Sequence, residues 1–239
     1  MNLTYALKEE ETKKAHKVQN LLIDQMMDHP MGPPEYYGVC FYRKSFDGGD
    51  LTPEDHYKRW NINEVRKTHK FIARQIHKCF GKDIPLWFFI NRHQGQQDIS
   101  ETSFAFGSAR SEEEYIARPN KQGSFHTDLY VGEIPDEAIA NPSPSLLEYF
   151  YKEDQSGLPI DSRQVGIDGK KLLLLEAVIR TSKWIGRHPK SLDLHQVPKQ
   201  EMEEKVICYG LKDLTTLEDL NSIVDFDNSY FYTPSKEKT

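Results

Sequence analysis

The stretch TPEDHYKRWNINEVRKTHKFIARQIHKCFGKDIPLWFFINR (residues 52–92) joins the best-marked helix of the chain to a strand. Thr52 can cap the helix and Pro53 suits its first position, and apolar residues then recur at helical spacing. The aromatic run over 84–92 is typical of a strand. We therefore expect a helix over 52–80 followed by a strand.

Two further strands surround this unit. Residues 36–45 (YYGVCFYRKS) precede it and residues 124–131 (SFHTDLYV) follow it. Two strands separated by a helix and followed by a third strand predict an α+β fold, with an antiparallel or mixed sheet and helices packed on one face. Residues 191–197 are expected to be irregular or extended. The other helices are expected at 4–27, 145–152, 170–186 and 198–212.

Three regions follow from this order of elements. Residues 1–34 form an N-terminal helical extension, residues 35–212 form the main domain, and residues 213–239 form an acidic C-terminal tail. No repeat and no low-complexity tract divides the main domain further.

Composition limits the class of protein. The 239 residues include 27 Phe, Tyr and Trp side chains, which favours a packed core over disorder. No apolar run is long enough to cross a bilayer and no secretory signal is visible, so we expect a cytoplasmic protein that does not bind membranes. The cysteines Cys40, Cys79 and Cys208 are odd in number and widely spaced, which argues against a disulfide scaffold or a zinc ribbon.

The formal net charge is -6, which by itself argues against nucleic acid as a partner. Residues 52–82, however, carry eight basic and three acidic side chains, a net charge of +5. Four of the basic residues share one helix face and could bind phosphates; the alternative is an ordinary solvated helix face. The residues that we expect to contact DNA are Arg43, Lys67, Lys70, Arg74 and Lys78.

The residues most suited to metal chemistry lie on the strand 124–131. His126 and Asp128 alternate with Thr127, so they share one face of the strand, at a spacing of about 7 Å. An imidazole and a carboxylate so placed can bind one divalent cation, although a polar strand face is the alternative interpretation. His93, at the end of the strand 84–92, could supply a third ligand, and Glu101 is its rival.

A tyrosine and a lysine mark the helix 198–212. Tyr209 and Lys212 lie at positions i and i+3, on one helical face, where a tyrosine oxygen could attack a phosphodiester beside a cation. Alternatively, Tyr209 continues an apolar stripe of the helix and belongs to the core. Tyr149 and Lys152 have the same spacing and compete for the role.

Together, the paired ligands FHTDLYV, the strand end INRHQG and the later helix ICYGLKD resemble the HUH-type endonucleases, which are rolling-circle replication initiators and relaxase-like nickases. The resemblance implies an RRM-like HUH nuclease fold over the main domain. It also implies Mg²⁺ or Mn²⁺ held by His93, His126 and Asp128, with Tyr209 as nucleophile and Lys212 as its partner. Asp128 stands where the family has its second histidine, and Thr127 where it has a bulky apolar residue.

The function implied by the resemblance is site-specific DNA nicking and joining through a 5′-phosphotyrosine intermediate. The implied partners are single-stranded or hairpin origin DNA of a plasmid or virus, together with a host helicase and polymerase. If the element is viral, the location would be the host cytoplasm or nucleus. Two alternatives remain: a metal-dependent phosphodiesterase that uses water, and a non-catalytic DNA- or protein-binding protein of a mobile element.

Overall fold

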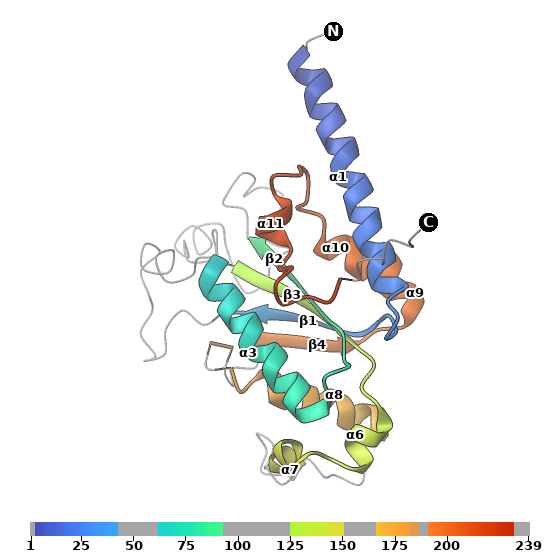
Figure 1. Ribbon diagram of the computed structural model, residues 1–239, viewed down its shortest axis with the longest axis vertical. Helices are drawn as coiled ribbons and strands as arrows, with labels where there is room; N and C mark the ends of the chain where they lie inside the picture. The colour runs from blue at the N-terminus through green and yellow to red at the C-terminus, as the bar shows by residue number, and fades with distance from the viewer. Residues whose placement is uncertain are drawn as a thin grey trace, which may run out of the picture.

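The computed structural model of the protein contains a four-stranded antiparallel sheet with helices around it (Figure 1). The predicted α+β class is confirmed, and the sheet is of the antiparallel kind. The structure describes residues 3–42, 62–92, 125–150, 166–182, 184–185 and 191–231.

The order of the strands in the sheet is β2-β3-β1-β4, and each neighbouring pair is antiparallel. β3 therefore separates β1 from β2, which run parallel to each other. The helix α3 lies between these two strands in the sequence, and this is a split β-α-β unit. The stretch expected to be irregular or extended is the strand β4, because its backbone pairs with β1. The strands are β1 (Pro34–Phe41), β2 (Leu86–Arg92), β3 (Phe125–Gly132) and β4 (Leu192–Gln196).

One face of the sheet, here called the back face, carries Tyr36, Phe88 and Leu129 and is covered by four helices. Ile72 and Ile76 of α3 pack into this layer, as the helical spacing predicts. The part of α3 that the structure describes begins at residue 62, and α8 ends seven residues before the predicted end. The four helices are α3 (Ile62–Phe80), α6 (Asp136–Ala140), α7 (Pro144–Phe150) and α8 (Ile167–Ile179).

The opposite face, here called the front face, is also covered, although we expected the sheet to be packed on one face. Trp87, Phe89 and Tyr130 point to this side and are fully buried. Three such aromatic side chains must be shielded from water, so the front face needs a layer of its own. Figure 1 shows α1 and the C-terminal helical segments on this side. These are α1 (Leu3–Met27), α9 (Lys199–Glu201), a π-helix (Met202–Ile207), α10 (Cys208–Gly210) and α11 (Leu220–Ile223).

The described part of the acidic C-terminal region packs along the free edge of β2. The Asp225 amide donates to the Phe88 carbonyl at 3.1 Å, and the Tyr230 amide donates to the Leu86 carbonyl at 2.8 Å. The indole of Trp87 also donates to the Tyr230 carbonyl, at 2.8 Å. These bonds satisfy edge groups of β2 that would otherwise be exposed.

The helix α1 has the predicted extent and projects beyond the sheet at its N-terminal end (Figure 1). Leu22, Ile23 and Met26, near its C-terminal end, pack into the front layer. None of the described helices is both long enough and apolar enough to span a bilayer. Cys40, Cys79 and Cys208 are free thiols.

Candidate metal and nucleophile site

His126 and Asp128 both point to the front face, as the alternation along the strand predicts. In the register of the sheet, Asp128 lies opposite Phe89 of β2, and His126 lies opposite Asn91. Thr127, between them, points to the back face, where it contacts α3. Both side chains lie on an inner strand of the sheet, because β1 and β2 flank β3 on either side.

Asp128 is completely buried, and two neighbouring side chains bind its carboxylate. The Tyr37 hydroxyl donates to Oδ1 at 2.8 Å, and the Asn91 amide donates to Oδ2. Burial raises the pKa of Asp128 to about 6, against these two hydrogen bonds and the charge of Lys212, which lower it. The carboxylate therefore titrates close to neutral pH.

Asn91 connects the carboxylate to the C-terminal helical segment. Its Nδ2 also donates to the Gly210 carbonyl at 3.2 Å, one residue from Tyr209. Its Oδ1 has no hydrogen-bond partner among the described residues, although the side chain is only 1% exposed. A buried oxygen of this kind is one that a cation or a water molecule would satisfy.

The helical segment that carries Tyr209 begins after Pro198 and contains a π-helical stretch. π-Helical stretches are often found at functional sites. Tyr209 is 48% exposed, so the alternative interpretation as a core tyrosine is wrong. The apolar stripe consists of Met202, Val206 and Tyr209, and of these only Met202 is fully buried. The Lys212 ammonium lies 3.7 Å from the centroid of the Tyr209 ring.

This helical segment lies closely on the sheet because residue 210 is a glycine. A β-carbon at Gly210 would come within 2.2 Å of the Tyr130 hydroxyl. That hydroxyl donates to the Val206 carbonyl at 3.0 Å, so a hydrogen bond from Tyr130 on the sheet binds the π-helix. On the outer side, Gln19 of α1 donates to the Leu211 and Leu214 carbonyls at 3.0 and 2.7 Å.

The pKa of Tyr37 responds both to the carboxylate of Asp128 and to the nucleophile candidate Tyr209. Burial and the charge of Asp128 raise the pKa of Tyr37, and Tyr209 adds to the same shift. The structure thus brings His126, Asp128, Tyr209 and Lys212 to one side of the sheet. Tyr37 and Asn91 were not identified from the sequence, although both lie on predicted strands.

Only some of the candidate ligands of a divalent cation lie among the residues that the structure describes. His126, which is 8% exposed, and Asp128 offer one imidazole and one carboxylate as ligands. On the adjoining strand, the amide oxygen of Asn91, which has no hydrogen-bond partner among the described residues, is a third candidate ligand atom. The carboxylate and amide oxygens are the ligand atoms that Mg²⁺ and Mn²⁺ prefer, whereas an imidazole is a more usual ligand of softer transition metals. In the part of the chain that the structure describes, three or more His, Cys, Asp or Glu side chains do not gather as a metal site. His93 and Glu101 lie outside the described residues.

Tyr149, the rival nucleophile, belongs to another part of the fold. It lies on α7, is 7% exposed and packs in the back layer. It is therefore on the other side of the sheet from Asp128, and Lys152 lies outside the described residues.

The basic residues of α3 are exposed, as a phosphate-binding face requires, but they lie behind the sheet. Because α3 covers the back face, they occupy the layer opposite to Asp128. Lys67 also pairs with Glu64 of the same helix, at 2.5 Å. The exposed basic residues of this face are Lys67, Lys70, Arg74 and Lys78, while Arg43 lies outside the described residues.

Comparisons with known protein families, with curated protein sequences and with solved structures find no match to this chain.

Proposed function

We propose that the protein is a metal-dependent DNA nicking-joining endonuclease of the HUH type that initiates replication of a mobile element. The observation that carries this proposal is the exposed Tyr209 beside Lys212, connected through Gly210 and Asn91 to the buried carboxylate of Asp128. A solvent-accessible tyrosine next to a cation suits attack on a phosphodiester.

The topology supports an RRM-like nuclease fold. The order β2-β3-β1-β4 with a split β-α-β unit places β3 and β1 at the centre of the sheet. His126 and Asp128 are therefore on a central strand, where neighbouring strands can add donors from both sides. An edge strand would offer one neighbour and a less defined geometry.

In the proposed reaction, the Tyr209 oxygen forms a bond to the phosphorus of a phosphodiester and the bond from phosphorus to the 3′-oxygen breaks. The tyrosine gives up one proton and the departing 3′-oxygen takes up one, so the step is balanced. Lys212 has three N–H donors with which to hold the phosphate oxygens beside the tyrosine ring. The product is a 5′-phosphotyrosine and a free 3′-hydroxyl.

The residues that would hold Mg²⁺ or Mn²⁺ are His126, Asp128 and the Asn91 oxygen, with His93 as the further ligand that the resemblance implies. The bound ion supplies Lewis-acid polarisation of a phosphate oxygen. Tyr37 and Asn91 orient the Asp128 carboxylate toward the site, because each of its oxygens accepts one hydrogen bond.

The proposed substrate is single-stranded or hairpin origin DNA, bound with its scissile phosphate at Tyr209. The basic face of α3 lies behind the sheet, so it suits DNA that flanks the cleaved strand and passes around an edge of the protein. A host helicase and polymerase would act next on the 3′-hydroxyl. These steps imply the cytoplasm, or the nucleus for a viral element.

The proposal can be tested with a 3′-labelled library of random single-stranded oligonucleotides and Mn²⁺, followed by denaturing electrophoresis. We expect a covalent protein–DNA band that EDTA abolishes, with the adduct mapped by mass spectrometry to the peptide containing Tyr209. Tyr209→Phe should abolish the band, and Tyr149→Phe, the matched control, should retain it. Cleavage without a covalent band would instead identify a hydrolytic phosphodiesterase, and intact DNA would indicate a non-catalytic binding protein.

A further inference from the structure

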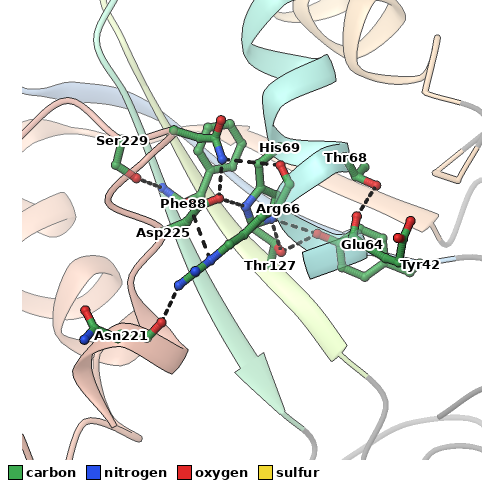
Figure 2. A network of polar contacts seen from close by, with 11 residues as sticks. Tyr42, Glu64, Arg66, Thr68, His69, Phe88, Thr127, Asn221, Asp225 and Ser229 are labelled. Carbon is green, nitrogen blue, oxygen red and sulfur yellow. Dashed lines mark hydrogen bonds and ion pairs between the residues drawn. The ribbon is translucent and has the colours of Figure 1, made fainter. Parts of the chain in front are cut away.

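A second polar cluster lies directly behind the candidate site, on the back face of β3 (Figure 2). The Thr127 hydroxyl is 2.8 Å from Nε2 of His69 on α3, and the Tyr42 hydroxyl is 2.9 Å from the same nitrogen. The two hydroxyls are 2.5 Å from each other. All three side chains are buried.

The other nitrogen of His69 binds the C-terminal region. Nδ1 lies 2.6 Å from Oδ2 of Asp225, and this oxygen also accepts a hydrogen bond from Asn228 at 2.7 Å. Arg66 lies 3.8 Å from the second carboxylate oxygen. The chain of contacts therefore runs from the C-terminal segment through α3 to the middle of β3, as Figure 2 shows.

The protonation state of this chain of contacts follows from its burial. Burial lowers the pKa of His69, more than Asp225 raises it, so the imidazole is neutral. Burial alone would raise the pKa of Asp225, but its hydrogen bonds to His69 and Asn228 hold that pKa below its usual value. Hence Nδ1 carries the proton and donates to Asp225, and Nε2 accepts from a hydroxyl.

An aspartate, a histidine and a threonine in this arrangement have the contacts of a nucleophilic triad. Thr127 is only 1% exposed and His69 is completely buried, so a substrate cannot reach the hydroxyl. The network instead affects the position of the strand β3. Thr127 is the residue between His126 and Asp128, and bonds that fix its side chain behind the sheet also fix the strand from which the two neighbours point forward.

We propose that His69 and Asp225 are positioning residues that hold β3 at Thr127 and so fix the direction of His126 and Asp128 on the front face. What this positioning serves rests on the proposed function; the positioning itself does not. The support extends to the C-terminal segment, because the Asp225 amide is bonded to β2 and Arg66 donates to the Asn221 carbonyl.

The test compares Thr127→Val, which keeps the shape and removes the hydroxyl, with Thr127→Ser, which keeps the hydroxyl. Thr68→Val is the matched control, because Thr68 is a buried neighbour of His69 whose hydroxyl, among the described residues, bonds only the carbonyl of Glu64. The first readout is hydrogen exchange of the amides of residues 126–128, measured by NMR without metal or DNA. The second is the rate of covalent adduct formation at saturating oligonucleotide.

We expect Thr127→Val to speed exchange of these amides by about tenfold or more, because a buried hydrogen-bonded unit loses a partner. The adduct rate should fall by a similar factor with the oligonucleotide Kd unchanged. Thr127→Ser should restore both readouts, and Thr68→Val should alter neither. If Thr127→Val does not fold, Tyr42→Phe removes the other hydroxyl and should act in the same direction.

Wild-type exchange rates in Thr127→Val, or equal effects of Thr127→Val and Thr68→Val, would overturn the positioning role. Failure of Thr127→Ser to restore the exchange rates would do the same. If the wild-type protein forms no adduct, the proposed function fails, while the exchange measurements still decide whether the bonds of the Thr127 hydroxyl to this network hold β3.

Discussion

Replacing Asp128 with asparagine removes a charge that the fold buries completely, and the variant is expected to be more stable than the wild type at alkaline pH. The pKa of Asp128 is about 6 in the folded protein and 3.8 as its ordinary value. Between these pH values the folded protein binds more protons than the unfolded chain. The contribution of this group to stability is therefore greatest at acid pH and declines as the pH rises through 6.

The size of the effect follows from the same shift. Two pKa units at about 1.4 kcal/mol each make the ionised carboxylate about 3 kcal/mol unfavourable above pH 6. Asparagine at 128 would turn the Asn91 amide around and break its bond to the Gly210 carbonyl, which costs about 1 kcal/mol. Asp128→Asn should thus raise the free energy of unfolding by about 2 kcal/mol at pH 8 and lower it by about 1 kcal/mol near pH 4.

Urea denaturation followed by circular dichroism at both pH values measures this difference. Asp24→Asn on the exposed surface of α1 is the control, and its effect should not depend on pH in this way. If Asp128→Asn were destabilised equally at pH 4 and pH 8, the ionised carboxylate would carry no burial cost and the reasoning would be refuted. In the adduct assay the same variant should be inactive, because the site loses its anionic ligand.

Two further substitutions test how the Tyr209 segment is held on the sheet. Gly210→Ala should lower the free energy of unfolding by about 1–3 kcal/mol by urea denaturation, because its β-carbon meets the Tyr130 hydroxyl, whereas Gly166→Ala, with open space around it, should not. Gln19→Leu should cost about 1–3 kcal/mol by the same measurement, because two carbonyls lose their donor, and Asn20→Leu on the exposed side of α1 is its control.

The local pattern of the sequence was sufficient for β1, β2 and β3 and for the direction of the main site residues. Alternation along 124–131 predicted that His126 and Asp128 share a face, and the helical spacing of 198–212 placed Tyr209 and Lys212 together. Such predictions depend on backbone periodicity, which is a local property. Exposure of Tyr209 could not be decided in the same way, since it depends on how far the helix is from the sheet.

Contacts between distant segments had no signal in the sequence. His69 and Asp225 are 156 residues apart, and Tyr37 and Asp128 are 91 apart. Strand order decides such pairs, and β4 was not recognised as a strand because five residues with a polar outer side have weak strand patterning. Without the order β2-β3-β1-β4, Asn91 could not be placed beside Asp128.

The two faces of β3 use buried polar groups in opposite ways, and this difference separates function from stability. On the front face, burial makes the ionised Asp128 costly, so its removal should stabilise the fold at pH 8 and abolish the reaction. On the back face, the Thr127 hydroxyl is hydrogen-bonded within a buried network, so its removal should weaken the fold and slow the reaction together. If both the substitution at Asp128 and the one at Thr127 lowered the free energy of unfolding, the carboxylate of Asp128 would have a structural role. Opposite signs of the two stability changes, with loss of adduct in both, would identify Asp128 as a residue kept for its chemistry.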